Sequence, residues 1–275
     1  MFQPIDFDVK FTQYAEKWMK TELSKGRKAE DLEDEIPDVY IKFLNTPASW
    51  LEGAVPGMFF AKWNDPEELI EILKEYEKNG TPIPDPLLER IMDLGKVSEA
   101  PLSGLASDES APHALRVTAM NLLIELEAEC TDLCTRLVLN REDEDDLADA
   151  AADLLRNTGR GALEKLLNAM DEAEGAALDT LLDLLCEFPG DERIYKKTLE
   201  RFLSDPDHLA LHASFLAKLG DARAIEPLKT MSTLAELNYL DYIEIRDAVE
   251  ELGGSLDTER EFAGDPYYES LKDMD

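Results

Sequence analysis

Apolar residues recur at helical spacing along much of the chain, and several of these runs end at a glycine. The glycines are Gly159, Gly190, Gly220 and Gly253, at intervals of 31, 30 and 33 residues. Before Gly190, for example, leucines stand at 178, 181, 182 and 185. Leucine and alanine at i, i+3, i+4 and i+7 predict helices with one buried stripe, and a glycine just past the stripe is a common helix stop.

The residues after two of these glycines also repeat, as Gly-Asp-x-Arg at 190–193 and at 220–223. The aspartate is a good N-cap, because its carboxylate accepts the free N–H groups of the next helix. Each repeat therefore reads as helix, tight turn, helix. The first helices are expected near 97–107, 130–140, 161–171, 191–203 and 221–231, and their partners near 110–127, 143–158, 175–187, 206–219 and 238–253. No alternation of β-branched residues predicts a strand, so we expect an all-α fold.

Residues 217–228, with the sequence AKLGDARAIEPL, resemble the HEAT-repeat signature in the short-period form also found in phycobilisome lyases. The stretches 115–119 and 245–249 are similar to the Arg-x-x-Ala segment of that family's second helix, and Pro227 matches a proline of its first helix. Over about 97–253, the resemblance implies a right-handed α-α superhelix, a HEAT-like solenoid of the armadillo-like type used mainly as a binding platform. It implies no lyase chemistry, because no matching active-site motif is present.

The N-terminal part differs in composition, since it holds all three tryptophans. Residues 8–25 predict one amphipathic helix with Phe11, Tyr14, Trp18 and Leu23 inward, and residues 65–95 predict a further hairpin. A solenoid needs its open end covered. We therefore expect an aromatic-rich helical capping segment at 1–64, a solenoid of five to six hairpins at 65–253, and an acidic tail at 254–275.

Two groups of aromatic residues are candidate binding residues. Tyr40, Trp50, Phe59 and Trp63 could line a pocket or a protein-binding patch, because Trp and Tyr dominate interface hot spots; alternatively they form the core of the capping segment. Tyr267 and Tyr268 in the tail would dock on the last repeat or on a partner, and self-association through them is a third reading.

The histidines and cysteines offer only weak metal-site candidates. His208 and His212 are four residues apart on a predicted helix, so both could face one metal, with Asp205 or Asp207 as a third ligand. Structural histidines that flank the core are the better reading. Cys130 and Cys134 lack a second pair, and with Cys186 they read as small buried apolar residues. The acidic run 142–146 reads as helix capping.

The charge balance limits the classes of partner that the chain is expected to bind. The chain of 275 residues has 61 acidic and 28 basic residues and a net charge of -33. Such a surface disfavours nucleic acid and anionic membranes and steers basic partners toward it, although solubility alone also explains it. No apolar stretch is long enough to span a membrane and no secretory signal opens the chain, so a cytoplasmic location is expected.

No phosphate-binding loop, dinucleotide turn or nucleophile elbow is present, and we expect no cofactor. The sequence thus favours a non-catalytic protein–protein interaction scaffold for a partner with a basic patch. The alternative is an enzyme or accessory protein that binds a small molecule at the aromatic N-terminal segment.

Overall fold

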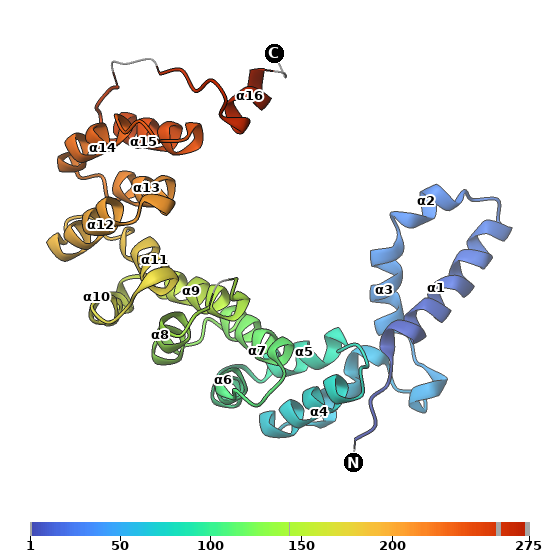
Figure 1. Ribbon diagram of the computed structural model, residues 1–275. Coiled ribbons are helices and arrows are strands. Elements are labelled where there is room, and N and C mark those ends of the chain that lie inside the picture. The colour runs from blue at the N-terminus through green and yellow to red at the C-terminus, as the bar shows by residue number, and fades with distance from the viewer. Residues whose placement is uncertain (1, 143, 257–259, 273–275) are drawn as a thin grey trace. The chain divides into compact units, whose positions relative to one another are not determined.

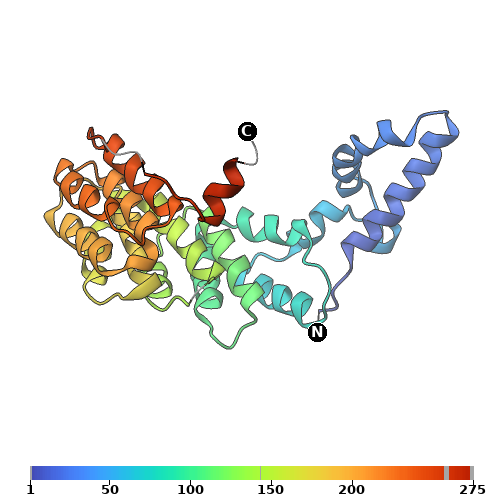
Figure 2. The same ribbon diagram turned by 45° about the horizontal axis from the view of Figure 1, so that its top comes forward.

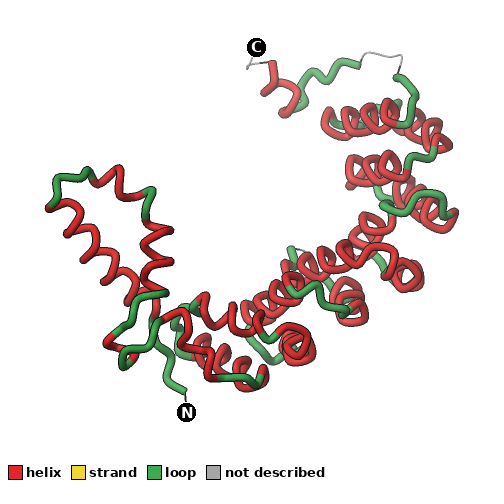
Figure 3. Tube along the Cα trace, turned by 180° about the vertical axis from the view of Figure 1, so that it is seen from behind, coloured by secondary structure: helices red, strands yellow, loops and turns green. Residues whose placement is uncertain are grey.

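The computed structural model describes residues 2–142, 144–256 and 260–272, and every regular element in these ranges is a helix (Figure 3). The all-α prediction is confirmed. Asp143 of the acidic run, and residues 257–259 and 273–275 of the predicted tail, lie outside the described residues. No helix in the described ranges is both long and apolar enough to cross a bilayer.

The chain forms two compact units, Met1–Leu133 and Cys134–Asp275, and the boundary falls inside α8 (Thr131–Leu139). The predicted boundary at residue 64 lies within the first unit. This boundary stays a prediction, as does the division into a capping segment, a solenoid and a tail.

The first unit opens with a helical hairpin in which α1 (Phe7–Ser24) and α3 (Ile36–Leu44) run side by side, joined by the short α2 (Ala29–Glu33) (Figures 1 and 2). The expectation that Leu23 points inward is wrong: it is exposed, and of the other predicted inward residues of α1 none is fully buried. The physical reason is length. At 1.5 Å per residue, the 18-residue α1 is twice as long as α3, so the end of α1 extends past its neighbour.

Two short 3-10 helices, η1 (Ser49–Leu51) and η2 (Pro56–Lys62), lead from this hairpin to helices α4 to α7. The predicted hairpin at 65–95 consists of α4 (Pro66–Lys78) and α5 (Asp85–Asp93), and the Asp65 carboxylate caps α4 by accepting the Glu67 N–H at 3.0 Å. A 3-10 turn, η3 (Gly95–Ser98), precedes α6 (Glu99–Ser107), which packs on α7 (His113–Glu125).

The second unit is a series of helical hairpins whose positions agree with the expected ones within a few residues (Figure 1). The second helix of each of the last four hairpins carries the apolar stripe that the sequence pattern indicates. The elements are α9 (Asp146–Thr158), η4 (Gly159–Gly161), α10 (Leu163–Met170), α11 (Gly175–Leu185), α12 (Glu192–Ser204), η5 (Pro206–His208), α13 (Leu209–Leu219), η6 (Ala222–Ala224), α14 (Ile225–Ser232), α15 (Tyr239–Glu251) and α16 (Pro266–Lys272).

The repeated Gly-Asp-x-Arg turns are built as the sequence predicts. Gly220 ends α13 in the left-handed conformation, with φ of 68°, and Asp221 then accepts the Arg223 N–H at 3.0 Å. The Arg223 guanidinium folds back on Asp221, reaches Glu192 of the preceding turn at 2.8 Å, and lies 4.1 Å from the centre of the Tyr195 ring. The turn residues therefore join successive hairpins.

The C-terminal segment docks on the last hairpin. Arg260 donates hydrogen bonds to backbone carbonyls between α14 and α15, including Leu234 O at 2.6 Å and Ala235 O at 2.8 Å. Phe262 is buried against α15, and the Asp265 carboxylate accepts the Tyr239 N–H at 3.0 Å at the start of that helix. The segment around Phe262 therefore packs on the last repeat, whereas docking of Tyr267 and Tyr268 on a partner, or self-association through them, stays a prediction.

Candidate functional site

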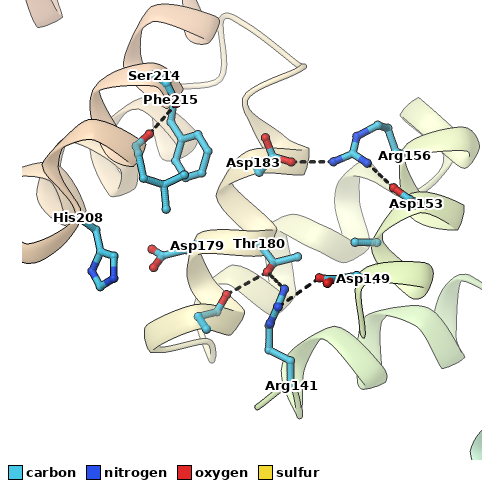
Figure 4. A pocket seen from close by; sticks show the side chains of 13 residues that line it. Arg141, Asp149, Asp153, Arg156, Asp179, Thr180, Asp183, His208, Ser214 and Phe215 are labelled. Atoms are coloured by element: carbon cyan, nitrogen blue, oxygen red, sulfur yellow. Dashed lines mark hydrogen bonds and ion pairs between the residues drawn. The ribbon is translucent and has the colours of Figure 1, made fainter. Parts of the chain in front are cut away.

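A groove of about 610 Å³ lies in the second unit, across the second helices of three successive hairpins (Figure 4). Helices α9, α11 and α13 contribute nearly all of its lining, and the segment before α9 contributes one arginine. The lining residues are Arg141, Asp149, Ala152, Asp153, Arg156, Ala176, Asp179, Thr180, Asp183, His208, Leu211, Ser214 and Phe215.

Arg141 lies at one end of the groove and joins α9 to α11. Its guanidinium donates to Thr180 Oγ1 and lies 3.2 Å from Asp149 Oδ1 (Figure 4). The arginine side chain is largely buried, whereas the Asp149 side chain is 62% exposed. The Asp149 carboxylate can therefore accept further hydrogen bonds from a ligand in the groove.

Arg156 forms the second link between α9 and α11. It lies 2.7 Å from carboxylate oxygens of both Asp153 and Asp183, and 3.3 Å from Glu187 (Figure 4). Lys218 of α13 approaches Asp183 and Glu187 from the other side, at 3.1 and 3.4 Å. Partial burial of Arg156 opposes its positive charge, but the carboxylates outweigh this and raise its pKa.

A more deeply buried network lies around Asp179 of α11, where this helix meets α12 and α13. Its carboxylate accepts from Arg201 Nε at 2.8 Å and from His212 Nε2 at 2.9 Å. Burial opposes ionisation of Asp179, but the hydrogen bonds from His212 and Arg201 outweigh it and hold its pKa at about 2, against an ordinary 3.8. Arg201 also reaches Asp205 at 2.8 Å, and His208 Nδ1 lies 3.0 Å from the same carboxylate.

Asp179, Asp205 and His212 are the described residues with the geometry closest to a metal centre, since their ligand atoms lie within 4.8 Å of one another. Arg201 already donates to both of these carboxylates, so a metal ion would have to displace the guanidinium. The rings of His208 and His212 lie 6.2 Å apart between centres, but only His212 belongs to this group. Each contacts a different aspartate, because η5 places His208 outside α13, where an unbroken helix was expected.

The groove can recognise a group that is both cationic and partly apolar. Asp149 and Asp153 are more than half exposed, and each has a single ion-pair partner among the described residues. Beside them lie Ala152 and Ala176, and Leu211 exposes 41% of its surface. Exposed carboxylates next to an apolar wall suit the aliphatic stem and charged head of an arginine or lysine side chain.

The predicted aromatic candidates of the first unit mostly contact other aromatic rings of that unit. Trp50 lies edge-on to Phe7 at 5.5 Å and stacks on Phe43 at 6.3 Å, and Tyr40 donates to Asp85 Oδ2 at 2.9 Å. Burial and the Asp85 carboxylate raise the pKa of Tyr40.

Phe59 and Trp63 continue this group of rings, 5.8 Å apart, and Trp63 also lines a surface hollow. In the tail, Tyr268 contacts Tyr239 at 4.9 Å between ring centres, while Tyr267 is exposed. The structure thus places Trp63 and Tyr267 where a ligand could reach them.

Sequence reasoning named His208 as a metal-site candidate but missed the aspartates of the groove. A signal was present, because Asp149 and Asp179 are 30 residues apart, as are Asp153 and Asp183. This is within one residue of the 31-residue interval between Gly159 and Gly190, the glycine stops of these two helices, so the members of each pair occupy nearly equivalent places in successive second helices. Comparison of the chain with family models, with curated proteins and with solved structures finds no match.

Proposed function

We propose that this protein is a non-catalytic protein–protein interaction scaffold, a HEAT-like right-handed α-solenoid whose acidic groove binds a basic segment of a partner protein. The observation that carries the proposal is the row of Asp149, Asp153, Asp179 and Asp183 beside the exposed Leu211. The solenoid itself rests on the repeated turns and on the similarity of residues 217–228 to HEAT repeats. The expected cytoplasmic location belongs to the same proposal.

The charge of the chain supports a basic partner. A net charge of -33 raises the local concentration of cationic segments and speeds their encounter, an effect that falls with ionic strength. The chain's own Arg156 and Lys218 already pair with Asp183, one of the groove carboxylates. These contacts show the type of side chain that the groove carboxylates accept.

The test is affinity capture from native lysate with the full chain as bait, compared with the double variant Asp149→Asn, Asp153→Asn. Both side chains are exposed and each has one ion pair, so the substitutions should leave the fold intact. The matched control is Asp171→Asn, Glu172→Asn, which removes the same charge from exposed positions outside the groove.

A basic protein retained by the wild type and by the control, released at high salt and lost by the groove variant, supports the proposal. Equal capture by all three proteins would refute a role for the groove.

The alternative function, small-molecule binding or catalysis at the aromatic N-terminal segment, has less support. The Trp50 ring contacts the rings of both Phe7 and Phe43, as expected of a small hydrophobic core. The alternative stays a prediction. A screen of the full chain for binding to small-molecule libraries tests it.

A further inference from the structure

The surface hollow beside Trp63 in the first unit combines an aromatic wall with carboxylates. It has a volume of about 480 Å³ and is lined by Phe2, Trp63, Glu67, Glu68, Glu71 and Ile72. The Phe2 ring lies edge-on to the Trp63 indole, 5.7 Å away, and packs against Tyr76 at 5.8 Å. The wall is thus fixed by ring contacts to the body of the unit.

Helix stability does not fully explain the acids of this hollow. Glu67 and Glu68 lie in the first turn of α4, where the helix dipole favours negative charge. Glu71 lies one turn further on, and Glu67, Glu71 and Glu75 form an i, i+4 row of like charges, which weakens a helix. Lys74 and Lys78 pair with Glu71 and Glu75. In the described part of the chain, nothing pairs with the carboxylates of Glu67 and Glu68.

The indole of Trp63 already attracts an ammonium group of this chain. Lys62 Nζ lies 4.2 Å from the centre of the Trp63 ring and 4.8 Å from that of Phe59. Tryptophan is the best aromatic partner for a cation, because its ring face carries negative charge density. A hollow lined by this ring and by two carboxylates that have no ion-pair partner among the described residues is complementary to an organic ammonium ion.

We propose that this hollow, the Trp63 hollow, binds the side-chain ammonium group of a lysine in a basic peptide. The carboxylates of Glu67 and Glu68 accept its N–H groups, and the Phe2 and Trp63 rings contact its aliphatic stem and charged head. The site is independent of the groove of the second unit, because none of its residues lies there.

The experiment is an NMR titration of the full chain, read at the indole N–H signals of its three tryptophans. The probe is acetyl-glycyl-lysyl-glycine amide, and the control peptide carries norleucine in place of lysine. We expect the Trp63 signal to shift saturably with the lysine peptide, at a Kd on the order of 1 mM for so small a ligand, and not with the norleucine peptide. The signals of Trp18 and Trp50 should stay in place.

Two variants test the carboxylates. Glu67→Gln with Glu68→Gln should weaken binding about fivefold. Glu30→Gln with Asp31→Asn, which removes first-turn acids from α2 instead, should leave binding unchanged.

Equal shifts with norleucine, an unresponsive Trp63 signal, or equal shifts of all three tryptophans would overturn the proposal. Tighter binding of tetramethylammonium ion than of the lysine peptide would overturn the assignment to lysine. None of these readings depends on the groove aspartates, so failure here and failure of the proposed function are distinguishable.

Discussion

The Asp179→Asn variant tests the buried ionic network most sharply. Asp179 is only 12% exposed and His212 is fully buried. Because the native structure lowers the pKa of Asp179 from 3.8 to about 2, ionisation of this carboxylate stabilises the fold. At about 1.4 kcal/mol for each pKa unit, the contribution at neutral pH is about 2 kcal/mol. Loss of the charge should therefore lower the free energy of unfolding by about that amount.

The sign of the pH dependence follows from the direction of the pKa change. A carboxylate whose pKa is lowered on folding contributes its full stability above its unfolded pKa of 3.8, and the contribution is lost as pH falls through about 2. Between these limits, at pH 3, about half of the contribution remains. The difference in unfolding free energy between wild type and Asp179→Asn should thus shrink to about half between pH 7 and pH 3.

The assay is urea unfolding followed by far-ultraviolet circular dichroism at both pH values. Asp153→Asn is the control, because its side chain is 64% exposed and such surface ion pairs contribute about 0.5 kcal/mol. A loss below about 1 kcal/mol for Asp179→Asn at pH 7, or an equal loss at both pH values, would refute the reasoning.

Three further predictions concern the repeats and the tail. Replacing Asp191 or Asp221 with Ala removes a helix N-cap, so each variant should lose about 1 kcal/mol of unfolding free energy, measured by urea unfolding. No loss of stability would contradict the capping role. Replacing Arg260 with Ala removes its bonds to backbone carbonyls and should raise the hydrogen-exchange rate of the segment around Phe262, whereas unchanged protection would show that the tail docks without them. Burial raises the pKa of the Cys186 thiol to about 12, so alkylation at neutral pH should require unfolding, and rapid labelling of the native chain would contradict this.

The hairpins of the second unit could be predicted from the sequence because their signals are local. The Leu178–Leu185 stripe and the Gly-Asp turns each act within a few residues, so the helix ends follow from periodicity and capping chemistry. His208 shows the limit of this approach. Pro206 and the Asp205 cap start a separate 3-10 turn there, and a helical wheel drawn through it misplaces the side chain.

The groove could not be read from any single helix, because its residues come together only when α9, α11 and α13 stack. Asp149 and Asp179 look like ordinary solvated acids in their own helices. Only the 30-residue interval between them indicates a shared face, and that interval becomes informative once the stacking is known. The role of the aromatic residues near Trp50 could not be predicted either, because a hydrophobic core and a binding patch use the same residue types.

The most direct measurement for the central claim is an NMR titration of the full chain with the peptide acetyl-Arg-Arg-Leu amide, followed through the methyl signals of Leu211 and Ala152. Our account predicts that these signals shift, and that Asp149→Asn with Asp153→Asn weakens the binding about fivefold. Unchanged methyl signals at saturating peptide, or equal affinity for the variant, would contradict the claim that the acidic groove binds basic segments.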